Sequence, residues 1–112
     1  MNALKNRVQL IGHLGNDPEV KTFDGGRTMA KFSVATNETY KKEGGEKVTE
    51  TQWHNIVAWN GTAKIAEKLL KKGSEIALEG KLTSRTWDDK DGVRHYITEV
   101  VANEILLLKS KE

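Results

Sequence analysis

The chain has 112 residues, a formal charge of +2 and no cysteine. This length suits one domain with a single core, and the nearly balanced charge excludes a polycationic tail but permits a local basic groove. The absence of cysteine excludes disulfides and thiolate metal sites. No apolar stretch has the length of a membrane span or of a signal-peptide core, so the sequence predicts a cytoplasmic protein.

The first part of the chain alternates apolar and polar residues as β-strands do. Strands are expected over residues 4–14, 19–23 and 28–40. Gly12 and Gly15 interrupt the first pattern, which indicates a bulge or a sharp bend. Asp24-Gly25-Gly26 predicts a tight hairpin between the second and third strands. Residues 41–47 (KKEGGEK) then form a charged loop whose composition is typical of a solvated, mobile connection.

Residues 51–60 (TQWHNIVAWN) contain two of the three tryptophans and lie on a strand predicted over 48–60. Side chains alternate between the faces of a strand. One face therefore carries Trp53, Asn55, Val57 and Trp59, and the other carries His54, Ile56 and Ala58. The second face suits the core. The tryptophan face is either a second core or a platform for a flat ligand, and the strand alone leaves both open.

Residues 62–72 carry a helical pattern with one apolar stripe, made of Ile65, Ala66, Leu69 and Leu70. Thr62 suits the N-cap, and Gly73 suits the left-handed position after the helix. Strands are expected again over 74–87 and 94–108, with a hairpin signal at Asp91-Gly92. In the first of these strands Gly80 is an expected bend, and the side chains expected to point inward are Ile76, Leu78 and Leu82.

Five curving strands with a helix between the third and the fourth is the arrangement of the OB-fold, a small all-β Greek-key barrel. An open α+β sheet or a sandwich explains the single helix less well. No repeat, low-complexity segment or linker divides the sequence. We therefore expect one OB-fold domain over residues 1–112, with its core at about 4–108.

No combination of residues predicts an enzyme, a metal site or a cofactor site. His13, His54 and His95 lie on separate predicted strands and form no zinc-binding spacing. Residues 88–92 (DDKDG) resemble a calcium loop only superficially, because aligning Gly92 with the loop glycine puts Thr98 at the position of the bidentate glutamate. No phosphate-binding glycine loop precedes the helix.

Four aromatic residues stand out, either because they share a strand face or because basic residues lie beside them in the sequence. They are Tyr40 before Lys41 and Lys42, Trp53 and Trp59 on one strand face, and Trp87 two residues after Arg85. Phe23 and Phe32 suit the core, and Tyr96 is ambiguous. Aromatic rings interleaved with Arg and Lys on an OB-type scaffold are typical of a platform for single-stranded nucleic acid, where each stacked base contributes ~1–3 kcal/mol whatever its identity.

Several blocks, in the same order, resemble the bacterial single-stranded DNA-binding protein family. They are GHLGNDPE at 12–19, TQWHNIV at 51–57, KGS at 72–74, EGKL at 79–82, RTW at 85–87 and TEVVA at 98–102. The similarity runs from about residue 4 to residue 107. It implies an OB-fold homotetramer, cytoplasmic and associated with the nucleoid. It also implies sequence-tolerant wrapping of single-stranded DNA during replication, recombination and repair.

The resemblance also implies roles for individual residues. Trp53 and Trp87 match the stacking tryptophans of the family, while Tyr40 and Trp59 replace its usual tryptophan and phenylalanine with another aromatic ring. The matching basic positions around the DNA path are Arg7, Lys72 and Arg85 and, in a looser alignment, Lys41 and Lys42. His54 matches a histidine at a subunit contact. The alternative for His54 is a hydrogen-bonded core residue.

The family usually continues into a flexible linker and an acidic tail that recruits other proteins, whereas this sequence ends at Glu112. Either the chain is naturally short or it is a truncated form, so partners recruited by a tail are doubtful. Two other functions remain open. One is an OB-fold module for protein interaction or assembly, whose binding would depend little on salt. The other is a binder of single-stranded RNA, which only contacts to 2′-hydroxyl groups would distinguish.

Overall fold

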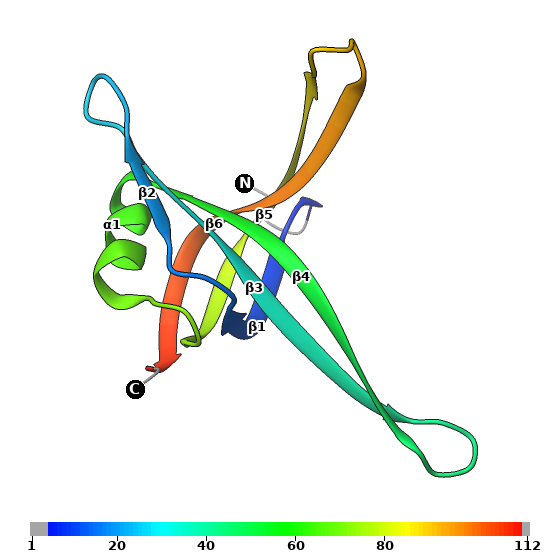
Figure 1. Cartoon of the computed structure of the whole chain (residues 1–112). Coiled ribbons are helices and arrows are strands. Elements are labelled where there is room, and N and C mark those ends of the chain that lie inside the picture. The colour runs from blue at the N-terminus through cyan, green and yellow to red at the C-terminus, as the bar shows by residue number, and fades with distance from the viewer. Residues whose placement is uncertain (1–4, 111–112) are drawn as a thin grey trace.

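The computed structural model describes residues 5–110, which form six β-strands and one α-helix (Figure 1). In chain order these are β1 (Val8–Leu14), β2 (Glu19–Thr22), β3 (Thr28–Lys41), β4 (Lys47–Trp59), α1 (Asn60–Leu69), β5 (Glu75–Asp88) and β6 (Arg94–Lys109). Residue 4, where the first strand and the domain core were expected to begin, lies outside the described residues, as do residues 111 and 112 of the expected domain.

Five of the strands close into a barrel in the order β1-β5-β6-β4-β3, and β1 completes it by pairing with β5 and with β3. His13 pairs with both Glu75 of β5 and Ala35 of β3. A Cβ on the preceding Gly12 would overlap the carbonyl oxygen of Ala35, so the crossing requires a glycine. The short strand β2 pairs only with β3. The expected OB-fold, with α1 between the third and fourth barrel strands, is confirmed.

The barrel interior is filled by side chains that alternate along the strands. Almost completely buried are Phe32 and Val34 of β3, Ile56 and Ala58 of β4, and Ile76 and Leu78 of β5. Leu82 was also expected inside, but it is half-exposed. The strand pairing of β1 with β5 ends at Gly80, and at Leu82 the amide side chain of Asn6 bonds the backbone of β5 in its place, which leaves the Leu82 side chain half-exposed.

Helix α1 contacts β3, β4 and β6, and the stripe predicted for it is only partly correct, since Ala66 and Leu70 are buried in the core but Ile65 and Leu69 are not. Its buried residues are Ala63 and Ala66, whereas Ile65 and Leu69 are exposed. The expected N-cap at Thr62 is wrong, because the helix already begins at Asn60, and the Thr62 hydroxyl donates to the carbonyl of Asn103 at 3.4 Å. Small alanine side chains let the helix approach the barrel closely, which the apolar periodicity alone does not reveal.

Two long hairpins extend beyond the barrel in different directions (Figure 1). Pairing of β3 with β4 continues from Met29–Trp59 to Lys41–Lys47, and pairing of β5 with β6 continues to Asp88–Arg94. Outside the barrel each hairpin is a two-stranded ribbon whose two faces both meet solvent. The molecule therefore measures 57 Å along its longest axis and offers ribbon surfaces in addition to the barrel wall.

Replacing Ile56 with alanine is expected to lower the free energy of unfolding by about 2–5 kcal/mol, because the side chain is fully buried and its removal leaves a cavity. Urea unfolding followed by circular dichroism measures this change. Ile65→Ala on the exposed side of α1 is the matched control and is expected to cost about 1 kcal/mol or less. Equal losses for both variants would contradict the packing described here.

Candidate nucleic-acid interface

Trp53 is an exposed aromatic platform on the outer face of β4. It pairs with Ala35 of β3, and 62% of its surface remains accessible. Its ring lies against Gly15, where a Cβ would overlap the indole carbons. The glycine therefore makes room for the indole beside the connection between β1 and β2. The core interpretation of Trp53 is wrong, since Ile56 and Ala58 on the opposite face of β4 fill the core instead.

Trp59 lies on the same face of β4 and is partly covered by the hairpin between β2 and β3. The Phe23 ring is tilted by 34° against the indole at 6.0 Å between centroids, and the Arg27 guanidinium carbon lies 4.8 Å from the ring centroid. Phe23 was expected in the core but is 44% exposed, because its hairpin projects past the barrel wall. Arg27 was not singled out from the sequence. The turn predicted at Gly25-Gly26 was nevertheless a signal, because a chain reversal there brings Arg27 close to Phe23.

Trp87 lies on the β5–β6 hairpin and is stacked on one side by a histidine. His95 faces it directly across the two strands, with ring centroids 4.3 Å apart and an angle of 18° between the planes. The Nε2 atom of His95 lies 2.7 Å from Oδ2 of Asp89. Trp87 keeps 46% of its surface exposed, so the indole is held by its neighbour yet remains accessible to a ligand.

The carboxylate of Asp89 ties this arrangement to the hairpin turn. Its Oδ1 accepts hydrogen bonds from the backbone N–H groups of Asp91 and Val93, both at 2.9 Å. The pKa of Asp89 is lowered from its ordinary value of 3.8, mainly by the hydrogen bond with His95 and then by the backbone N–H of Val93. A lowered pKa means that the carboxylate stays ionised near neutral pH, and that its hydrogen bonds are lost only when acidification passes below that pKa.

Tyr40 does not share a surface with Trp53. It pairs with Val48 near the tip of the β3–β4 hairpin, and the alternation along β4 puts Val48 and Trp53 on opposite faces. The Tyr40 ring is exposed, and its hydroxyl donates to Oε1 of Glu50 at 3.1 Å. Of the four aromatic residues singled out from the sequence, only Trp53 and Trp59 are thus brought onto one strand face.

The basic residues fall into two groups. Lys41, Lys42 and Lys72 have exposed side chains, and the backbone N–H of Lys72 donates to Oδ1 of Asp17 at 2.8 Å. The two arginines instead form ion pairs within the chain, at 3.0 Å from Arg7 to Glu79 and at 3.0 Å from Arg85 to Glu99. Arg7 and Glu79 are 72 positions apart, so no local pattern could have predicted their pair. The pair of Arg85 and Glu99 crosses the β5–β6 hairpin and depends on the register of its two strands.

Arg85 keeps donor capacity in spite of its ion pair. Glu99 is only 6% exposed, and a buried carboxylate needs such a partner. The Arg85 side chain itself is 55% exposed. Because a guanidinium has five N–H donors, part of it remains available to another anion beside Trp87.

His54 is half-buried, and its Nε2 lies 3.0 Å from the Thr36 hydroxyl oxygen. This hydrogen bond within the chain fits the alternative interpretation of His54, that of a hydrogen-bonded core residue. The expected subunit contact stays a prediction.

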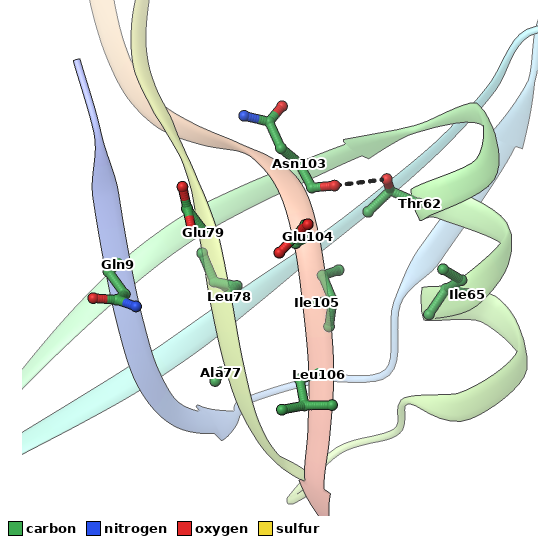
Figure 2. A pocket seen from close by; sticks show the side chains of 10 residues that line it. All are labelled: Gln9, Thr62, Ile65, Ala77, Leu78, Glu79, Asn103, Glu104, Ile105 and Leu106. Carbon is green, nitrogen blue, oxygen red and sulfur yellow. Dashed lines mark hydrogen bonds between the residues drawn. The ribbon is translucent and has the colours of Figure 1, made fainter. Parts of the chain in front are cut away.

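The outer face of the β1–β5–β6 sheet carries an exposed apolar row. Ile11, Ala77 and Leu106 pair in sequence across the three strands, and both Ile11 and Leu106 are exposed. Leu106 also lines a cavity of about 410 Å³ between this sheet and α1, into which Ile65 faces from the helix (Figure 2). Apolar residues grouped on one sheet face are typical of a contact surface.

Residues 5–110 also bear on two other kinds of site. In that range no three His, Cys, Asp or Glu side chains are grouped so that they could hold a metal ion. No helix there has the length and apolar character needed to cross a membrane.

The barrel and its exposed aromatic residues define an OB-fold protein of the nucleic-acid-binding class. The model of the single-strand binding protein family matches residues 5–108. The chain belongs to this family, which is a family of DNA-binding proteins without enzymatic activity.

Named relatives agree with this assignment. Single-stranded DNA-binding protein 1 of Chlorobaculum tepidum is 44% identical over 96% of this chain and 67% of its own length. Single-stranded DNA-binding protein 1 of Xylella fastidiosa is 44% identical over 98% of this chain and 82% of its own length. The single-stranded DNA-binding protein of Neisseria meningitidis serogroup A is 45% identical over 92% of this chain, which spans 59% of that protein.

A solved structure is similar over nearly the whole chain. It is the complex of Plasmodium falciparum SSB with single-stranded DNA, with a TM-score of 0.86 and 31% sequence identity. The match covers 93% of this chain and 95% of that one.

Removing the His95 imidazole is expected to raise the pKa of Asp89 toward its ordinary value of 3.8, because its main stabilising hydrogen bond is lost. Carboxyl chemical shifts followed by NMR between pH 2 and pH 6 measure this pKa in the parent protein and in His95→Ala. An Asp89 pKa that does not change on removal of His95 would show that the contact is absent in solution.

Proposed function

We propose that this protein binds single-stranded DNA by stacking bases on Trp53, Trp59 and Trp87 while lysines pair with the phosphates. The observation that carries the proposal is the exposure of Trp53, whose indole lies beside Gly15 with 62% of its surface accessible. Every base has an aromatic face, so each stack contributes ~1–3 kcal/mol without reading the sequence. Family membership and the likeness to a complex with single-stranded DNA support the same ligand.

The spread of the aromatic rings favours a long, flexible ligand over a compact one. Trp53 and Trp59 lie on the barrel wall, whereas Tyr40 and Trp87 lie on separate hairpins. A single strand can pass from one ring to the next, but the stiffness of a duplex and its already stacked bases prevent this. Tyr40 offers its ring on the other face of its ribbon, where a strand that passes around the hairpin would meet it.

The phosphate contacts are assigned to exposed side chains of Lys41, Lys42 and Lys72 and to Arg85 beside Trp87. Arg7 would have to exchange its ion pair with Glu79 for a phosphate, so we assign it the smallest contribution to phosphate binding. Each phosphate neutralised on a single strand lowers log K by ~0.7 per tenfold increase in salt.

The same proposal covers the chain as a whole. Residues 1–112 act as one OB-fold domain, since the barrel strands run from Val8 to Lys109. The protein works in the cytoplasm on the nucleoid, in replication, recombination and repair, and it requires no cofactor. Family membership supports the cellular role, and the one core cluster of the described residues supports a single domain.

We assign a homotetramer as the assembled state, in keeping with the family. The exposed row of Ile11, Ala77 and Leu106 supports a contact between copies of the chain, because its burial would remove apolar surface from water. His54 is assigned to a second contact, although its hydrogen bond with Thr36 also suits an isolated subunit.

Trp53→Ala is expected to weaken binding of oligo-dT by about 5- to 150-fold, equivalent to the loss of one stacked base at ~1–3 kcal/mol. The melting temperature should hardly change, because the indole is outside the core. Trp53→Phe keeps an aromatic face and should retain most of the affinity. A collapse of the melting temperature with unchanged affinity per folded molecule would exclude the stacking role.

Titration with oligo-dT is expected to quench tryptophan fluorescence. The affinity should fall as salt rises, and log K should decrease by ~0.7 per phosphate contact for each tenfold increase in salt. Duplex DNA of the same length should quench weakly. Oligo-U is the comparison for RNA. Equal affinity for oligo-U would leave the nucleic acid undecided, and salt-independent binding without quenching would favour the protein-interaction module.

Leu106→Glu is expected to reduce the oligomeric state, since it places a charge within the apolar row on the outer sheet face. His54→Tyr should reduce it on dilution. Sedimentation velocity over a hundredfold range of concentration measures both, with Leu69→Glu on the exposed side of α1 as a control for an added surface charge. Unchanged sedimentation of Leu106→Glu removes this face from the interface, and unchanged sedimentation of His54→Tyr removes His54.

A further inference from the structure

We propose that His95 is a positioning residue for DNA binding: it holds the Trp87 indole in its stacking orientation, and its protonation tightens binding of the single strand. The inference rests on the proposed stacking role of Trp87. It also gives a function to a histidine that the sequence connected with neither metal binding nor catalysis.

The first step of the argument is the geometry of the two rings. Trp87 and His95 face each other on a two-stranded ribbon, 4.3 Å apart and within 18° of parallel. This part of the ribbon extends beyond the barrel. The core therefore does not hold the indole of Trp87 in place. One side of the indole is thus occupied by imidazole, so that a base can stack only on the other side. Holding the ring in advance reduces the ordering entropy lost when DNA binds.

The second step is the anchor of the imidazole. Asp89 holds Nε2 of His95 at 2.7 Å, and its other oxygen accepts the backbone N–H groups of Asp91 and Val93. The turn is closed by the backbone hydrogen bond from Asp89 N–H to the Val93 carbonyl at 3.0 Å. The hairpin turn, the carboxylate, the imidazole and the indole therefore form one connected series that ends at the stacking surface.

The third step is the charge that a proton adds. Imidazole is the side chain that ordinarily changes its charge between pH 5 and pH 8. When His95 is protonated, its hydrogen bond to Asp89 becomes charge-assisted, its contact with Trp87 becomes a cation–π contact, and a positive charge appears beside the DNA path. The added positive charge favours binding of an anionic strand directly, and the two stronger contacts within the chain hold the indole more firmly in its stacking orientation, so affinity rises as pH falls.

The other charged groups near His95 are already paired or point elsewhere. On its own ribbon face, Arg85 is bonded to Glu99. On the opposite face Asp88 and Arg94 pair with each other at 3.4 Å. Lys90 and Asp91 belong to the exposed turn. Asp89 is thus the carboxylate in direct contact with the imidazole, and its lowered pKa keeps it ionised between pH 5.5 and pH 8.

Trp59 provides an internal comparison. Its ring is accompanied by Arg27, whose guanidinium remains charged at every pH of interest. The two tryptophans therefore have cationic partners of different kinds, one permanent and one titratable. Of these two sites, only that of Trp87 is expected to change its affinity between pH 5.5 and pH 8.

The experiment compares His95→Ala and His95→Phe with the parent protein, using fluorescently labelled oligo-dT at fixed salt, at pH 5.5 and pH 8.0. His95→Ala is expected to weaken binding at pH 8.0 by about 3- to 10-fold, because an aromatic pair is lost. His95→Phe keeps a flat ring and should restore the affinity at pH 8.0. The parent should bind about 2- to 10-fold more tightly at pH 5.5, as expected for one partly exposed cation–π contact, and both variants should lose this gain.

His13→Ala reports the pH dependence that comes from the exposed histidine on β1, which lies in one cross-strand row with Ala35 and Trp53. The gain assigned to His95 is the part that His95→Ala loses and His13→Ala keeps. Circular dichroism melts confirm that each variant is folded. A pH profile that is unchanged in His95→Ala overturns the proposed effect of protonation. A His95→Ala affinity equal to that of the parent at pH 8.0 overturns the positioning role.

Combining Trp87→Ala with His95→Ala separates this inference from the proposed function. If His95 acts through Trp87, its removal should have no further effect once the indole is absent. A full additional loss in the double variant would show that His95 contacts DNA independently, and would overturn the positioning role. If Trp87→Ala alone leaves the affinity unchanged, the stacking role of Trp87 fails, and this inference fails with it.

Discussion

The register of β3 against β4 is the constraint on which the rest of the structure depends. Phe32 opposite Ile56 and Ala30 opposite Ala58 fill the barrel, which leaves Trp53 and Trp59 on the outer face of the same strand. A slip by one residue would bury the indoles and expose the core, so burial of small and branched side chains holds the aromatic surface in place. The same strand pairing thus determines both the stability of the barrel and the position of the aromatic surface.

The exposed rings are oriented by neighbours that belong to adjacent strands and turns. Gly15 makes room for Trp53, the β2–β3 hairpin brings Phe23 and Arg27 against Trp59, and the β5–β6 hairpin brings His95 against Trp87. Each ring is therefore partly ordered before any ligand arrives. A surface of this kind loses less entropy on binding than one built from freely rotating side chains. Under the proposed function, the turns contribute to affinity by holding the rings, although none of their backbone atoms need touch the ligand.

Only some of the basic side chains have a structural role that would compete with binding of the proposed ligand. Arg7 and Arg85 join neighbouring strands through carboxylates, and Glu99 would be a costly buried charge without its arginine. The exposed lysines at the β3–β4 tip and in the α1–β5 connection do not have this structural role. We infer that salt-dependent binding depends mainly on lysines, while the arginines connect the barrel with the surface that carries the rings.

The sequence by itself determined the strand faces, the turns and the order of elements, because alternation, glycine and Asp-Gly signals act locally. It also determined that Trp53 and Trp59 share a face opposite Ile56. Only the tertiary structure decided which side of α1 is buried, that Phe23 is exposed, and that Trp87 meets His95 while Arg85 meets Glu99. Those outcomes depend on which strands become neighbours and in what register, and a local pattern contains neither.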